Sequence, residues 1–322
     1  MSLAPTAALT IADLRYDAQL ASVTVVLGLL PEVNRCRAVL PATVRFEASP
    51  GDPASLTLSG LGLAGGAAAA IVLTGTVHRV RRDPRWIHLD VTDASGALAA
   101  VRPGAGYTAT SAADVVVALL GEAAAVPGEL RLDLPLAGYV ADQSRTAAEH
   151  LARLAGLAGC IGTVTGEGPV AVVPPPADAD TALRHGRELL TYRVADHGPP
   201  VARTVPVGSG AASPEELRPS PDFLPADAPE PAADVRRVPE AVLRAPTSAG
   251  TASDAADAAA SRLSRRLYAR CVLLPSLRPG TVVEVAEAPD GTLTGPWLLT
   301  RVTHRVTAGR PAGTELDGTA AS

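Results

Sequence analysis

The clearest pattern in this sequence is an alternation of apolar and polar residues within TGTVHRVRRDPRWIHLDVTD, where Val77 and Val80 precede a turn. Ile87, Leu89 and Val91 occupy every second position after a turn at Asp83 and Pro84. A period of two places successive side chains on opposite faces of a strand. The segment therefore predicts a β-hairpin with one apolar face and one face of arginine and histidine.

Similar stretches of β-branched or alternating residues fill much of the first and last thirds of the chain, and proline, glycine and aspartate turns separate them. The predicted strands are residues 23–30, 43–47, 55–61, 71–82, 86–92, 271–274, 281–286, 297–306 and about 314–316. These patterns predict a protein that is mainly β.

Helical spacing interrupts the strand pattern in three places. Capping boxes, in which a hydroxyl and an acidic side chain cap the first turn, begin at Ser111 and at Thr146. The second predicted helix stops at Gly159, and a strand pair at residues 160–165 and 170–173 follows it. A third helix is predicted over residues 251–270, which are rich in alanine.

Residues 174–246 differ from the rest because they hold 14 of the 29 prolines. Proline lacks the N–H that a sheet ladder needs and does not fit inside a helix. We expect a surface excursion with strands only at residues 189–194 and 201–207.

Composition excludes several functions. All 28 basic residues are arginine, so a Schiff-base or P-loop lysine is absent. The net charge of −5 and an aromatic content of 3% argue against a nucleic-acid surface. Apolar runs are too short for a membrane span, and the N-terminus lacks a secretory signal, which predicts cytoplasmic synthesis. Three widely spaced cysteines, Cys36, Cys160 and Cys271, predict buried thiols in a reducing compartment.

Catalytic and cofactor motifs are not convincing. Residues 60–65 match G-x-G-x-x-G, but a strand and not a helix follows them, so we expect a hairpin loop and no nucleotide site. His78, His88 and His304 alternate with apolar residues on strands, which favours a solvent or interface face over metal binding. We predict no catalytic residue, no cofactor and no metal. The cluster Arg79, Arg81, Arg82 and Arg85 fits either an acidic partner or a solvated strand face.

Several longer segments occur in a fixed order. GTVHRVRRDPRWIHLDVTDASGALAAV is followed by YTATSAADVVVALLGEA and then by a predicted helix that Gln143 precedes, with Leu151, Leu154 and Ala155 before Gly159. Near the C-terminus, LRPG precedes VVEV, and GPWLLTRVTH follows. This order resembles the phage late control gene D family, the baseplate hub proteins of contractile tails, which are related to the N-terminal part of VgrG spikes; GPWLLTRVTH resembles the closing strand of that family.

The resemblance implies a mainly β fold with α+β insertions, in which two tube-like antiparallel β-barrels flank a small helix–hairpin unit. The implied regions are 1–105 (first barrel), 106–175 (helix–hairpin unit), 176–245 (proline-rich extended segment) and 246–322 (helix and second barrel).

The implied function is a structural, non-enzymatic hub: a homotrimer that joins a hexameric inner tube to a separate trimeric spike, with baseplate wedge proteins as further partners. It would be assembled in the cytoplasm as part of a phage-tail-like particle, without nucleic-acid binding or a membrane span. The candidate interface residues are Arg79, Arg81, Arg82, Arg85, Arg301 and His304. Two alternatives remain at this point: a particle-associated cell-wall hydrolase, and a β-rich binding module unrelated to any particle.

Overall fold

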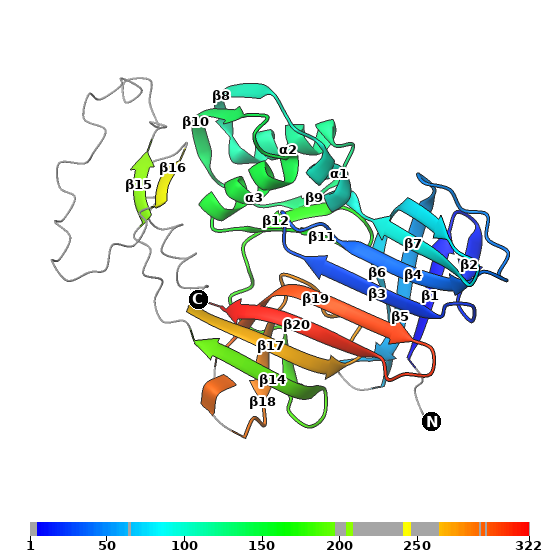
Figure 1. The fold of residues 1–322 in the computed structure, drawn as a ribbon. Coiled ribbons are helices and arrows are strands. Elements are labelled where there is room, and N and C mark those ends of the chain that lie inside the picture. Colours follow the sequence, from blue (N-terminus) through cyan, green and yellow to red (C-terminus); the bar gives the residue numbers. More distant parts are fainter. Residues whose placement is uncertain are drawn as a thin grey trace.

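The computed structural model describes residues 5–63, 66–196, 204–208, 241–245, 264–289, 291–293 and 295–321. Strands make up most of the described chain, and the helices lie together beside one large sheet (Figure 1). The prediction of a mainly β protein with helical insertions is therefore confirmed.

The large sheet has 13 strands, which come from both ends of the chain. We call the N-terminal group the first half: β1 (Thr6–Ile11), β2 (Leu14–Tyr16), β3 (Ser22–Gly28), β4 (Arg35–Pro41), β5 (Pro53–Leu61), β6 (Ala67–Arg82) and β7 (Trp86–Thr92). The second half contains β13 (Thr181–Arg184), β14 (Leu189–Asp196), β17 (Arg265–Val272), β18 (Val282–Ala286), β19 (Trp297–Thr307) and β20 (Gly313–Ala320).

The strand order across this sheet is β14-β17-β20-β19-β3-β4-β7-β6-β5-β1-β2, and β18 joins β13 to β19. An antiparallel ladder between β3 and β19, from Gly28 opposite Arg301 to Ser22 opposite Thr307, connects the two halves. Without that ladder the two halves would be separate sheets.

Each half has its own hydrophobic core, because inward residues alternate with polar ones along the strands. Leu9, Leu56 and Leu89 are fully or almost fully buried in the first core, and Leu267 and Trp297 in the second. No ladder among the described residues closes either half into a ring, so the two tube-like barrels stay a prediction. The three cysteines are buried free thiols, as predicted.

The third part is the helix–hairpin unit, which has a core of its own. It comprises α1 (Ala94–Ala100), β8 (Ala105–Ser111), α2 (Ala112–Glu122), β9 (Pro127–Leu130), β10 (Pro135–Ala141), α3 (Ala147–Leu157), β11 (Ile161–Val164) and β12 (Val170–Val173). Both predicted capping boxes are present, with Ser111 and Thr146 as N-caps. Gly159 adopts a φ of 68°, which glycine tolerates at a helix end.

Several predicted elements differ from the observed ones. Residues 43–47 form a turn and loop. Arg265–Val272 is strand β17 and not the end of a helix, because Leu267, Ala269 and Cys271 alternate into the core. The rest of the predicted helix, residues 251–263, lies outside the described residues. Helix α1, which Asp93 caps, was not predicted.

The proline-rich segment contains more strands than the one or two expected. β13 and β14 belong to the large sheet, where they pair with β18 and β17. β15 (Thr204–Gly208) and β16 (Ala241–Ala245) form a separate parallel pair. The prolines lie outside β13 and β14, so they did not prevent these two strands from joining the large sheet.

Strand β6 changes partners in its middle. It pairs with β5 as far as Thr76 and with β7 from Thr76 to Arg82. At this change Gly75 lies against the backbone of β7, and a Cβ atom there would be 2.7 Å from the Cα of Asp93. The absence of a side chain at Gly75 lets the two strands come this close.

Candidate functional site

The arginines of β6 line a hollow of about 360 Å³ on the polar face of the first half. The residues around it come from three neighbouring strands and are Arg35, Arg37, Ala38, Val39, His78, Arg79, Arg81, His88, Leu89 and Asp90. We call this group the basic hollow. Of the six candidate interface residues, it brings together Arg79 and Arg81.

Strand register explains why these side chains meet. Asp90 of the central strand β7 lies opposite Arg37 of β4 on one side and Arg79 of β6 on the other. One step along the strands, His88 lies opposite Arg81. The ladder has a bulge between Val77 and Arg79, so Val77 faces the core while Arg79 faces outward.

Positive charge dominates the basic hollow. Arg37 forms an ion pair with Asp90 at 3.3 Å, and Asp90 is the only carboxylate among the lining residues. Arg35, Arg79 and Arg81 form no ion pair with any residue that the structure describes. Four arginines thus stand against one aspartate, and the arrangement can bind anionic groups.

Arg82 and Arg85 do not line the hollow. The guanidinium of Arg82 donates to the carbonyl oxygen of Phe46 at 2.9 Å and lies 5.8 Å from the centre of that ring. Arg85 belongs to the turn, where its N–H donates to Asp83. That bond, together with bonds from His88 and the N–H of Trp86, holds the pKa of Asp83 below its usual value.

Arg301 lies on β19 in the second half and is already paired. Its guanidinium contacts Glu32, and a second carboxylate, that of Asp317, is 4.0 Å away. The hydrogen-bonded Glu32 raises the pKa of Arg301. Four residues further along β19, Arg305 pairs with Glu315 at 3.1 Å.

His304 is not a surface residue, so its assignment as an interface residue was wrong. Its side chain is 0% exposed, and its Nδ1 lies 3.0 Å from the hydroxyl of Thr314. Burial, with the nearby positive charge of Arg278, lowers the pKa of His304 to about 4. His304 thus packs inside the second half as a neutral imidazole.

Arg35 and Arg37 were not among the predicted site residues, because β4 was not predicted as a strand. A signal was nevertheless present in the letters RCRAVL, in which arginines alternate with the buried residues Cys36 and Ala38. Both inward residues are small, so the alternation is weaker than in a strand of leucine or valine.

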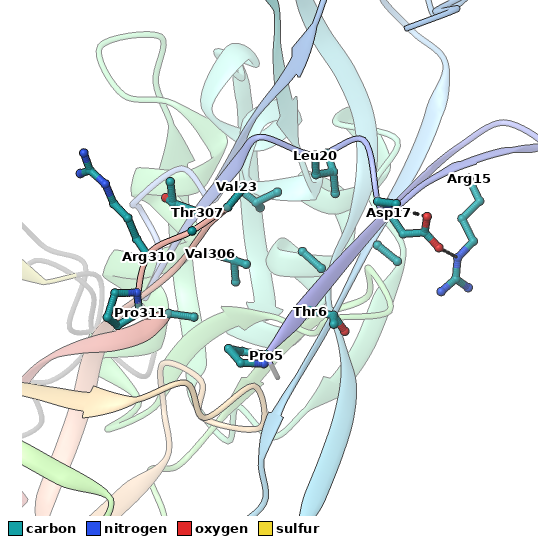
Figure 2. Close-up of a pocket in the computed structure, with 16 residues that line it drawn as sticks. Pro5, Thr6, Arg15, Asp17, Leu20, Val23, Val306, Thr307, Arg310 and Pro311 are labelled. Carbon is teal, nitrogen blue, oxygen red and sulfur yellow. Dashed lines mark hydrogen bonds and ion pairs between the residues drawn. The ribbon is translucent and has the colours of Figure 1, made fainter. Parts of the chain in front are cut away.

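A second hollow, of about 690 Å³, separates β1 from the turn between β19 and β20. Figure 2 shows Pro5 and Thr6 on one side of it and Val306, Thr307 and Arg310 on the other. The ladder between β1 and β2 covers only Leu9 to Ile11, so residues 6–8 of β1 pair with β5 alone among the described strands. Such an open strand edge can accept an extended segment.

Two sequence motifs can be placed directly. Of the glycine-rich residues 60–65, Gly60 and Leu61 end β5, and residues 64–65 lie outside the described residues. β5 pairs with β6 as an antiparallel hairpin, as predicted. Among the described residues, no group of three histidine, cysteine, aspartate or glutamate side chains is placed to hold a metal ion. The described helices include none that is both long and apolar enough to cross a bilayer.

Comparisons with known proteins give matches in structure. No protein-family model matches the chain, and no curated protein matches it in sequence. The 43 kDa tail protein of prophage MuSo2 from Shewanella oneidensis matches with a TM-score of 0.69 and 13% identity, over 98% of both chains. A tail protein from Neisseria meningitidis matches with a TM-score of 0.72 and 12% identity, over 98% of this chain and 96% of the other.

A third match is an Escherichia coli protein described as a component of the type VI secretion system with structural similarity to the T4 tail proteins gp27 and gp5. Its TM-score is 0.64 at 11% identity, over 98% of this chain and 77% of the other. The three matches agree in extent, since each covers almost the whole of this chain. The chain therefore has the fold of these phage-tail and type VI secretion proteins.

Proposed function

We propose that this chain is a structural baseplate hub of a contractile, phage-tail-like particle. The observation that carries the proposal is a match along 98% of the chain to tail proteins and to a type VI secretion component. A fold shared over the full length supports a shared architectural role more strongly than a match to one half would. The proposal assigns the chain no catalytic step.

The large sheet supports a ring-shaped assembly. Eight consecutive strands run from β14 to β6 in its order, and both ends are open edges. Among the described strands, β14 pairs only with β17, and residues 78–82 of β6 pair only with β7, whereas the backbone of Val77 is hydrogen-bonded to Gly51 and Asp52. An unpaired strand edge offers a row of backbone donors and acceptors to another chain. The β14 edge of one copy can therefore pair with the β6 edge of the next.

Symmetry favours three copies in that ring. The eight strands divide into four over the first core and four over the second, joined by the β3–β19 ladder. Three copies would present six similar units while keeping true three-fold symmetry. Such a homotrimer fits between a six-fold inner tube and a separate three-fold spike protein, with baseplate wedge proteins around it. In this proposal the protein is made in the cytoplasm and works as part of the particle.

Copy number tests the proposal. Native mass spectrometry of the full chain, alone and in the purified particle, should give three copies, beside six copies in each tube ring. Six copies in the particle, or a monomer at every concentration and in the particle, would contradict it.

A pair of edge variants tests the ring contact itself. N–H groups of adjacent residues in a strand point to opposite sides, so Ala195→Pro and Asp196→Pro remove donors from opposite edges of β14. One variant should lose the trimer while the other keeps it, and both should retain the far-ultraviolet circular dichroism of the parent. Equal trimer formation by both variants would exclude β14 as the contact.

A further inference from the structure

The basic hollow combines an open shape with three arginines that form no ion pair with any described residue, and this combination points to a ligand. Its lining includes four arginines and one aspartate, and Arg37 alone of these arginines is paired with that aspartate. In the second half, by contrast, Arg301 and Arg305 of the same sheet each have a carboxylate partner. Arginines on this sheet can thus be neutralised by a carboxylate, whereas three of the four in the basic hollow form no ion pair with a described residue.

We propose that the basic hollow binds an extended acidic segment of a partner protein, with carboxylates two residues apart. This site does not depend on the oligomeric state proposed above.

Arginine spacing on the two outer strands carries the geometric part of the argument. Arg35 and Arg37 are two residues apart on β4, and Arg79 and Arg81 are two residues apart on β6. Same-face side chains in a strand repeat about every 7 Å, and the two outer strands lie about 10 Å apart across β7. Alternate side chains of an extended bound segment repeat with the same spacing. Carboxylates two residues apart in the bound segment can therefore each meet an arginine of β4 or of β6.

Arginine is suited to carboxylates because its planar guanidinium can donate two parallel hydrogen bonds to both oxygens. Asp90 occupies the centre of the floor, where it holds Arg37 at 3.3 Å and lies opposite Arg79 in the ladder. The side chain of Asp90 is only 29% exposed, so it forms part of the floor of the basic hollow and does not block its opening. Arg35, Arg79 and Arg81 remain available to an incoming anion.

The same features favour a protein segment over a nucleic acid. Single-stranded nucleic acids are held by aromatic side chains on which bases stack, and no aromatic ring of tyrosine, tryptophan or phenylalanine lines the basic hollow. A volume of about 360 Å³ accommodates a few side chains. The whole chain has a net charge of −5, which opposes a long polyanion.

A peptide-binding titration with the full chain tests the inference. The probe is a fluorescein-labelled peptide of alternating serine and glutamate, followed by fluorescence anisotropy at low salt. The control probe replaces each glutamate with glutamine, and a third probe is an oligothymidylate of similar length. The acidic peptide should bind, its affinity should fall as salt is added, and the glutamine peptide should not bind.

Matched double variants locate the site. Arg79→Gln with Arg81→Gln should weaken binding about tenfold or more, because charge-assisted hydrogen bonds are lost. Arg301→Gln with Arg305→Gln changes the net charge equally on the paired part of the sheet and should alter the affinity less than about twofold. Asp90→Asn should strengthen binding, because it removes the competing carboxylate and releases Arg37. A gain in affinity cannot be caused by misfolding, so this variant tests the site even if the arginine variants fold poorly.

Three results would overturn the inference. The glutamine peptide could bind as tightly as the acidic one, which would exclude carboxylate recognition. The oligothymidylate could bind more tightly than the acidic peptide, which would identify a nucleic-acid surface. Equal losses in the two double variants would show that only net charge matters.

Discussion

The polar faces of the two halves belong to one sheet, yet they use arginine in different ways. In the first half, Arg35, Arg79 and Arg81 line a hollow without an ion-pair partner among the described residues. In the second half, Arg301 pairs with Glu32, and Arg305 pairs with Glu315. The number of carboxylates within reach decides the outcome: Glu32 and Glu315 serve one arginine each, whereas Asp90, the one carboxylate that lines the basic hollow, is bound by Arg37. An arginine-rich strand is a candidate binding surface only when the nearby carboxylates leave some of its charge unpaired.

The largest effect on stability is expected at the contact between β6 and β7, the two strands that carry Arg79, Arg81 and Asp90. Gly75→Ala adds a methyl group that would lie 2.7 Å from the Cα of Asp93, in a ladder whose backbone cannot move freely. We expect the free energy of unfolding to fall by about 4 kcal/mol, measured by urea denaturation. The β6–β7 register, and with it the basic hollow, should be lost at lower urea than in the parent.

A control for that change is Gly121→Ala on α2, where no atom lies within 4 Å of the added Cβ. This substitution should stabilise the protein by about 0.5–1 kcal/mol, because alanine favours the helix. If Gly75→Ala unfolded at the same urea concentration as the parent, the close approach of β6 and β7 would not be needed to hold the first half together.

The second half should respond to acid through His304. Burial lowers its pKa from 6.5 to about 4, so the unfolded chain takes up a proton between these values while the folded chain does not. The stabilisation that comes from keeping His304 neutral is therefore fully present above pH 6.5, and it is lost as the pH falls toward 4. The shift corresponds to about 3 kcal/mol.

His304→Gln removes the titrating group, so urea denaturation between pH 7 and pH 4 should show a weaker pH dependence in the variant. Between pH 7 and pH 4 the free energy of unfolding should fall by about 3 kcal/mol less in the variant than in the parent. His78→Gln, on an exposed histidine of the first half, is the matched control. Parallel pH curves for His304→Gln and the parent would show that folding does not lower the pKa of His304.

The smallest expected effect is the change in stability when one arginine is replaced, and it compares the polar faces of the two halves most directly. Arg301→Gln breaks the contact with Glu32 and should lower the free energy of unfolding by about 0.5 kcal/mol at low salt, with a smaller loss at high salt. Arg79→Gln should leave stability unchanged or raise it slightly, because it reduces repulsion among the arginines of the basic hollow. Chemical denaturation at two salt concentrations measures both. Equal losses would mean that the two faces do not differ in pairing.

Much of the fold could be predicted where a local signal was strong. The hairpin around Asp83 and Pro84 has large inward residues, and Ser111 and Thr146 cap helices within three residues of their acidic partners. Strand β17 was assigned to a helix because the alanine-rich residues before it favour a helix, and the predicted helix was extended through its period of two.

The candidate site was predicted only in part, for reasons that specific residues make clear. Arg79 and Arg81 were identified, but their neighbours on β4 follow from a ladder between residues far apart in the sequence. His304 shares its strand face with Val302 and Val306, whereas Arg301 and Arg305 occupy the other face. That parity already placed the imidazole inside, so this error was avoidable.

The ladder between β3 and β19 has a consequence for how the chain folds. It pairs Ser22–Gly28 with strand residues close to the other end of the sequence, so its closing loop contains most of the chain. Contacts between residues so far apart form late, because a long loop must be closed before they are made. During synthesis on the ribosome, β3 therefore waits with one edge unpaired until β19 has emerged. Folding of this protein should be slow, and chaperones that shield strand edges should matter most in that interval.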